Sequence, residues 1–188
     1  MTGINANLIK RCIASDEKAL YILYSECYSL MKGIALRYVY DQNDISDVVN
    51  RGFVKIVRGL KSYDVNQEFS PWAATVMIHE SLDYVRKIMR QQPKQLQLKK
   101  DLMHQASTSF EWNAADRQFD AEHLLKALNQ LPPKTRTVFN LFAIDGYSHD
   151  EISKKLKISE GTSKWHVSNA REKLKKMLAS KMTKIHSE

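Results

Sequence analysis

Polar and basic side chains gather near the C-terminal end of the chain in a pattern that suits DNA binding. Lys164 and Asn169 are residue types that read base edges by hydrogen bonding, and the lysines that follow suit phosphate oxygens better. A helix that begins beside them also directs its free N–H groups toward a phosphate. The predicted DNA contacts are Thr162, Lys164, Trp165, His166, Ser168, Asn169, Arg171 and Lys173.

A helix-turn-helix is the element that must position these side chains. Ser148 and Glu151 form a capping box, which predicts the start of a first short helix. Residues 157–161 then form a short turn, and a second helix is expected to begin near Thr162. Two short helices joined by such a turn, with the second rich in basic residues, are typical of a helix-turn-helix.

An upstream helix completes this C-terminal module. Pro132 and Pro133 suit its first turn, where missing N–H groups cost little, and Gly146 suits the position just past its end. The alternative is that the basic helix is an ordinary bundle helix with a solvated face. DNA binding is preferred because cap, turn and charge agree.

The distribution of charge supports a polyanionic partner. The chain has 188 residues and a net charge of +8. Residues 148–188 hold 10 lysines and arginines against 5 acidic residues, so the excess lies on the predicted DNA-binding end. Hydrophobic and charged contents of 43% and 27% are those of a soluble globular protein.

Aromatic residues beside cations form a second candidate nucleic-acid site in the first half of the chain. The aromatic residues are Tyr63, Phe69, Trp72 and Tyr84, and the cations are Arg86, Lys87 and Arg90. This combination suits single-stranded nucleic acid, whose bases stack and whose phosphates need neutralising. Phe69 and Trp72 equally suit a hydrophobic core, and for Trp72 the core is preferred.

Helical spacing of apolar residues predicts an all-α fold of two small domains. The first domain, residues 1–92, contains helices over 8–13, 19–36, 45–60 and 72–90, with a loop at 61–70. Residues 93–117 lack periodicity and predict a flexible linker, and residues 118–182 form the helix-turn-helix domain. No strand-like alternation occurs in the sequence.

Signatures of catalysis, metal binding and membrane insertion are lacking. The six histidines are scattered, and no phosphate-binding or nucleophile motif occurs. Asp44 and Asp47 lie one helical turn apart, but exposed acidic pairs at this spacing are common, so neither a metal nor a cofactor is expected. Cys12 and Cys27 suggest free core thiols in a reducing compartment, and no apolar run approaches about 20 residues. We expect a cytoplasmic, non-enzymatic protein.

Taken together in order, the segments resemble the extracytoplasmic-function group of bacterial RNA polymerase sigma factors. The first half carries DEKALYILYSECYSLMKGIALRY, NDISDVVNRGFVKIV and FSPWAATVMIHESLDYVRK, similar to the opening helices, the acidic segment and the F-x-x-W helix of the family. The second half carries LPPKTRTVF, GYSHDEISKKL and EGTSKWHVSNAREKL, similar to its helix-turn-helix module.

The resemblance implies a role for each candidate residue. Core RNA polymerase would be bound through Asp44, Asp47, Asn50 and Arg51. The melted minus-ten element, with one base flipped out, would be held by Tyr63, Asp64, Asn66, Phe69, His79, Arg86, Lys87 and Arg90. The helix-turn-helix would read the minus-thirty-five element of promoter DNA. An anti-sigma factor is an expected further partner.

Several residues depart from the family pattern. On the predicted DNA-reading helix, Trp165, Ser168 and Asn169 replace residues that are often small, aromatic or basic, so the DNA sequence that is read cannot be taken from the family. The other four departures are Asn50 in place of a frequent Gln, Arg51 in place of an acidic residue, His79 in place of Asn and Lys157 in place of Gly. If residue 157 is left-handed, its lysine costs about 1 kcal/mol. Two alternatives stay open: a dimeric helix-turn-helix regulator that works without core polymerase, and a nucleic-acid-processing enzyme, which would need a site that the sequence does not reveal.

Overall fold

The protein consists of helices and connecting turns in a computed structural model that describes residues 4–99 and 121–185, and side chains within 4–90 and 125–177. No strand occurs in these ranges, so the predicted all-α class is confirmed. The chain divides into two compact units, Met1–Asn113 and Ala114–Glu188.

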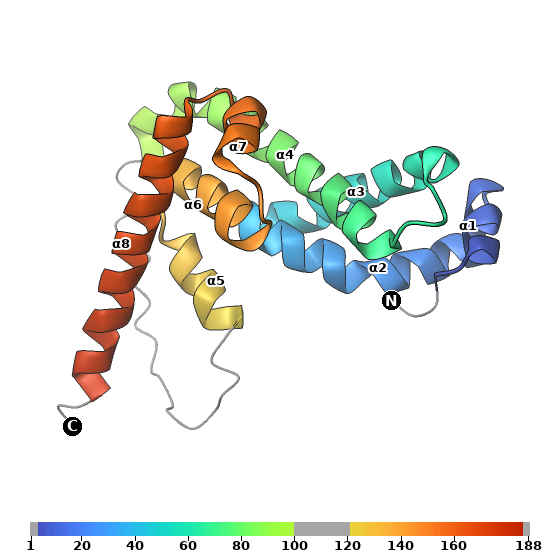
Figure 1. Cartoon of the computed structure of the whole chain (residues 1–188), viewed down its shortest axis with the longest axis horizontal. Coiled ribbons are helices and arrows are strands. Elements are labelled where there is room, and N and C mark those ends of the chain that lie inside the picture. The colour runs from blue at the N-terminus through green and yellow to red at the C-terminus, as the bar shows by residue number, and fades with distance from the viewer. Residues whose placement is uncertain (1–3, 100–120, 186–188) are drawn as a thin grey trace. The chain divides into compact units, whose positions relative to one another are not determined.

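Three long helices form the body of the first unit. They are α2 (Glu17–Tyr38), α3 (Ile45–Gly59) and α4 (Phe69–Lys99), and each packs against the other two (Figure 1). The short α1 (Ala6–Ile13) packs on α2 and reaches the 3₁₀ turn Leu60–Ser62 at the end of α3. A second 3₁₀ turn, Gln42–Asp44, leads into α3.

The core of this unit comes from the apolar positions that the helical spacing predicts. Leu23, Met31, Ile56 and Met77 are fully buried, and burial of each such side chain contributes about 1.5–3 kcal/mol. Cys12 and Cys27 are also buried and free, as predicted for core thiols. Burial raises the pKa of the Cys27 thiol to about 12, so this thiol stays protonated and unreactive.

A side-chain cap separates the first two helices, and α4 is longer than predicted. The Asp16 carboxylate accepts hydrogen bonds from the N–H groups of Lys18 and Ala19, which begins α2. α4 begins at Phe69 instead of Trp72 and continues to Lys99, so residues 93–99 of the predicted linker are helical. Glutamine, leucine and lysine around the proline favour helix strongly enough to continue it. The remaining predicted linker residues, 100–117, lie outside the described ranges.

Residues 121–185, the described part of the second unit, form four helices and a short π-helical segment. The helices are α5 (Ala121–Asn129), α6 (Pro133–Phe139), α7 (His149–Leu156) and α8 (Glu160–Ile185), and the π-helical residues 140–144 follow α6. α8 packs against α5, α6 and α7. An apolar cluster of the second unit is formed by Leu128, Leu131, Ala170 and Leu174.

The capping box and the glycine predicted for the helix-turn-helix are found at the predicted positions. Ser148 and Glu151 form the predicted capping box at the start of α7. Gly146 has φ +76°, a left-handed conformation that glycine adopts without steric cost. Lys157, the residue after α7, is also left-handed at φ 54° and ψ 50°. α8 begins two residues earlier than predicted because the Ser159 hydroxyl accepts from the N–H of Thr162 at 3.0 Å.

Lys157→Gly is expected to stabilise the second unit by about 1 kcal/mol, because glycine removes the clash of a Cβ in the left-handed conformation. Lys154→Gly is the matched control, since Lys154 is an exposed residue inside α7 and its replacement is expected to cost about 1 kcal/mol. Urea unfolding of the full-length variants measures both. Equal destabilisation by the two changes would contradict the prediction.

Candidate nucleic-acid interface

The outer face of α8 carries the residues that the sequence selects for reading bases. Lys164, Trp165 and Ser168 are exposed, and Asn169 is half-buried. The Trp165 side chain is 59% exposed, which is unusual for so large an apolar group. Lys164 has only a loose ion pair with Glu160, at 3.8 Å, so its ammonium group is available to a ligand.

Contacts beneath α8 fix the orientation of this face. The Ser163 hydroxyl is buried and lies 2.9 Å from Nδ1 of His149 on α7. The His149 ring stacks on Phe142, with centroids 4.3 Å apart and planes inclined by 12°. The guanidinium group of Arg171 lies 5.8 Å from the centre of the same Phe142 ring. α7 and α8 are therefore held at the turn by specific polar and aromatic contacts.

His166, another predicted DNA contact, faces the interior of the second unit. Its side chain is buried at 9% exposure, and Nδ1 lies 3.0 Å from the hydroxyl oxygen of Thr135 on α6. Burial, with a smaller effect from nearby Lys134, lowers the pKa of the imidazole. The neutral ring supports Trp165 from beneath, in an edge-on contact with centroids 4.9 Å apart.

The other predicted contacts of α8 lie before and after the base-reading residues along the helix. Thr162 is exposed in the first turn, where free N–H groups suit a phosphate. Arg171 is exposed farther along, and Lys173 is half-buried. Side chains suited to bases thus lie between side chains suited to the DNA backbone.

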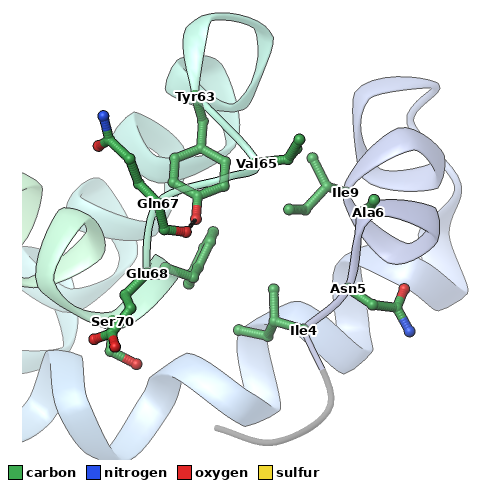
Figure 2. Close-up of a pocket in the computed structure, with 10 residues that line it drawn as sticks. Ile4, Asn5, Ala6, Ile9, Tyr63, Val65, Gln67, Glu68 and Ser70 are labelled. Carbon is green, nitrogen blue, oxygen red and sulfur yellow. Dashed lines mark hydrogen bonds between the residues drawn. The ribbon is translucent and has the colours of Figure 1, made fainter.

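The loop between α3 and α4 borders a hollow of about 330 Å³ in the first unit (Figure 2). Tyr63, Phe69 and Ser70 line it from the loop side. Rings of Tyr63, Phe69 and Trp72 contact one another, with centroids 4.8–5.4 Å apart. The Tyr63 hydroxyl also donates to the backbone carbonyl of Gln67, so the ring that faces the hollow is fixed at both ends.

Asp64 and Asn66, predicted minus-ten contacts, shape this loop and do not line the hollow. Oδ1 of Asp64 accepts from the backbone N–H of Asn66 at 3.0 Å and from its side-chain amide at 2.9 Å. These bonds form a compact turn of the kind that Asp and Asn favour. Both side chains are exposed beside the hollow.

Residues at the start of the chain form the opposite wall, which the sequence analysis did not identify. They are Ile4, Asn5, Ala6 and Ile9, at and before the beginning of α1 (Figure 2). No local signal in the sequence identifies them, because they meet the loop only through the packing of α1 at the end of α3.

Two of the predicted contact residues form ion pairs, one between α3 and α4 and one within α4. Arg51 donates to the buried carboxylate of Glu80 at 2.7 Å, and Lys55 bridges Glu80 and Asp83. Arg86 donates to Asp83 at 2.7 Å. Arg51 and Arg86 are thus oriented by intramolecular partners while about half of each side chain remains exposed.

The remaining basic and polar candidates on α4 are open to solvent. His79, Lys87 and Arg90 are exposed, and they lie on the helix that begins at the hollow. A rise of about 1.5 Å per residue puts Arg86 about 24 Å along the helix from Ser70. One helix therefore joins the hollow to the basic segment.

The predicted polymerase-binding residues of α3 have different surroundings. Asp47 is exposed, whereas half-buried Asp44 accepts a hydrogen bond from the Tyr84 hydroxyl at 2.8 Å. Burial and this bond raise the pKa of Tyr84. Asn50 is exposed and accepts from the Tyr24 hydroxyl at 3.3 Å. Asp44 therefore has a structural role that the sequence pattern did not indicate.

Neither a metal cluster nor a membrane-spanning helix occurs in the described part of the chain. No group of three or more His, Cys, Asp or Glu side chains is close enough to hold a metal ion there. Within the same ranges, no helix combines the length and apolar character needed to cross a bilayer.

Comparison with known protein families identifies the class that this fold and these surfaces define. Residues 23–91 match the family described as Sigma-70 region 2, and residues 121–174 match Sigma-70 region 4. Together these matches cover more than half of the chain. The protein therefore belongs to the sigma-70 family of RNA polymerase sigma factors.

Proteins that are similar over nearly the whole chain place it in the extracytoplasmic-function group of this family. The chain is similar to the ECF RNA polymerase sigma-E factor of Haemophilus influenzae, with 23% identity over 88% of this chain and 90% of that protein. It is 24% identical to the sigma-E factor of Escherichia coli K12, over 88% and 89%. The RNA polymerase sigma-H factor of Pseudomonas aeruginosa is 22% identical over 91% and 92%. The chain belongs to this extracytoplasmic-function (ECF) group.

Two solved structures are also similar to the chain. One is CnrH in complex with the cytosolic domain of CnrY, with 19% identity, a TM-score of 0.47 and coverage of 92% of this chain and 96% of that chain. The other is the sigma factor RpoE in complex with the anti-sigma factor NepR from Bartonella quintana, with 20% identity, a TM-score of 0.49 and coverage of 84% and 96%.

The burial of His166 predicts a pH dependence of stability. The folded state lowers the pKa of the His166 imidazole below its ordinary value of 6.5. The contribution of His166 to the free energy of unfolding is therefore complete above pH 6.5. It is lost as the pH falls, because the unfolded chain takes up the proton more readily than the folded chain. His166→Gln is expected to lower stability at pH 7.5 and to reduce its loss between pH 7.5 and 5. Urea unfolding at several pH values measures this, and an unchanged pH profile would contradict it.

Proposed function

We propose that the protein is an alternative sigma factor that binds core RNA polymerase and directs it to promoters. One observation carries the proposal: the chain combines an outward-facing polar and aromatic helix in a helix-turn-helix with a separate unit that has a base-sized hollow and a basic helix. The matches to sigma-70 regions 2 and 4, in that order, support it.

The two units have different tasks in this proposal. The first domain, residues 1–92, would bind polymerase and the melted minus-ten element, and residues 93–117 would connect it to the second domain. Residues 118–182 would read the minus-thirty-five element through α8. Flipping one base costs a few kcal/mol, which stacking on an aromatic ring and contacts in a pocket offset.

The protein would act in the cytoplasm, where polymerase and promoter DNA are found, and it would have no catalytic activity of its own. An anti-sigma factor that competes with polymerase is a further proposed partner, and no membrane insertion is involved. A dimeric helix-turn-helix regulator is disfavoured because it leaves residues 23–91, the part that matches sigma-70 region 2, without a task.

In run-off transcription, the full-length protein is expected to make core polymerase of the source organism initiate at specific promoters. Asp47→Lys is expected to weaken binding to the core about tenfold, or about 1.4 kcal/mol, because it reverses an exposed charge on α3. Glu17→Lys, an equal change at an exposed position of α2, is the control. A core that ignores the wild-type protein would refute the proposal.

Lys164→Ala is expected to weaken promoter binding by about 1–3 kcal/mol if Lys164 reads a base. Lys176→Ala is the matched control, because Lys176 is exposed on the same helix but lies beyond the base-reading half. Holoenzyme binding to minus-thirty-five variants at several salt concentrations measures both. An equal loss on every sequence, with a shallower salt dependence, would make Lys164 a phosphate contact instead.

A further inference from the structure

We propose that α1 and the residues before it form the second wall of the nucleobase pocket, and that the pocket takes a thymine. The inference rests on the proposed function and adds two things to it: a specificity element outside the segment that matches sigma-70 region 2, and the class of base that it accepts. That segment begins at residue 23, whereas the wall lies at residues 4–9.

The hollow has two sides that come from distant parts of the sequence. Figure 2 shows the side chains of Ile4 and Ile9 pointing across it toward the loop, with Val65 pointing back toward Ile9. Val65 is 55% exposed, so its aliphatic surface is accessible to a ligand in the hollow. Ile4 and Val65 thus present aliphatic surface to the hollow, and the buried Ile9 backs them at 5% exposure. The polar side chains of Asn5, Gln67, Glu68 and Ser70 line the rest of it.

The wall is held rigidly enough to select a ligand. Oδ1 of Asn5 accepts from the N–H of Leu8 at 2.9 Å, which caps α1 beside the hollow. Leu8, Ile9 and Cys12 are buried against the rest of the unit. At the other end of α1, Arg11 and Asp16 form an ion pair at 2.8 Å.

A stacking surface is present on the loop side. The Tyr63 ring is fixed by its hydroxyl bond to Gln67 and by edge contact with Phe69. An aromatic face of this kind binds an unstacked base. A volume of about 330 Å³ lies at the lower end of the range for small-ligand sites and accommodates one base.

The aliphatic side chains distinguish thymine from the other bases. Thymine is the only DNA base with a methyl group on its edge, and such methyl groups are read by apolar contact. A thymine stacked on Tyr63 would direct its 5-methyl toward the accessible aliphatic side chains of Ile4 and Val65. Removing one methyl from an apolar site lowers affinity about fourfold, from about 0.8 kcal/mol per buried carbon.

The experiment uses the full-length protein with core polymerase and a promoter on which the wild type is active. Each minus-ten thymine of the non-template strand is replaced singly by deoxyuridine, which removes only the methyl. One position is expected to show about fourfold weaker open-complex formation. At that position, Ile4→Ala and Val65→Ala are expected to lower the preference for thymine below twofold.

Ile13→Ala is the matched control, since Ile13 is an exposed isoleucine of α1 that does not line the hollow. This variant is expected to keep the full preference for thymine. Circular dichroism of each variant checks that it is folded. Ile4 and Val65 are only partly buried or exposed, so both changes leave the core intact.

The outcomes separate this inference from the proposed function. Loss of the preference in Ile4→Ala and Val65→Ala, but not in Ile13→Ala, supports the apolar wall. If wild-type holoenzyme forms open complexes with equal efficiency on thymine and deoxyuridine at every position, or the preference survives both wall variants, the inference fails while the proposed function stands. Absence of any promoter-specific open complex with the wild-type protein overturns the proposed function itself.

Discussion

Each helix of this protein buries one apolar stripe within its own small unit, and this constraint decides which faces remain for partners. In the first unit, the fully buried Leu23, Ile56 and Met77 come from three helices that pack pairwise. Once these stripes are buried, the polar faces of α3 and α4 must point outward. Arg51, Lys55 and Glu80 then meet along the junction of these helices and orient one another's side chains.

Close packing at the end of α3 controls the shape of the loop and hence of the base-sized hollow. A Cβ at Gly59 would lie 2.9 Å from a ring carbon of Trp72, so only glycine lets the indole approach this closely. Trp72 in turn contacts Tyr63 and Phe69. The stacking face of Tyr63 is therefore fixed by the core beneath it, which lowers the entropy cost of binding a base.

The second unit uses buried polar contacts where the first uses mainly apolar ones. Thr135 pairs with His166, and His149 pairs with Ser163, so both imidazoles have partners under α8. Satisfied buried polar groups specify one arrangement of helices, because any other arrangement would leave them unpaired. This arrangement leaves Trp165 exposed on the outer face of α8, next to the available ammonium group of Lys164.

The sequence by itself determined the features that depend on near neighbours along the chain. Helical periodicity, the capping box of Ser148 and Glu151, and the cap at Asp16 each act within one turn of helix, so they could be recognised without a fold. The ordered motifs also determined the family. The same local reasoning applied to Lys157, whose left-handed conformation follows from its place after a helix.

Only the tertiary structure decided contacts between residues far apart in the chain. In the folded protein His166 faces inward and pairs with Thr135, and Asp44 accepts a hydrogen bond from Tyr84. Ile9 lies across the hollow from Val65. Helical spacing shows that a residue lies on a given face, but which neighbour covers that face depends on how the helices pack. Polar residues can face either solvent or a buried polar partner, and their chemical type does not distinguish these cases.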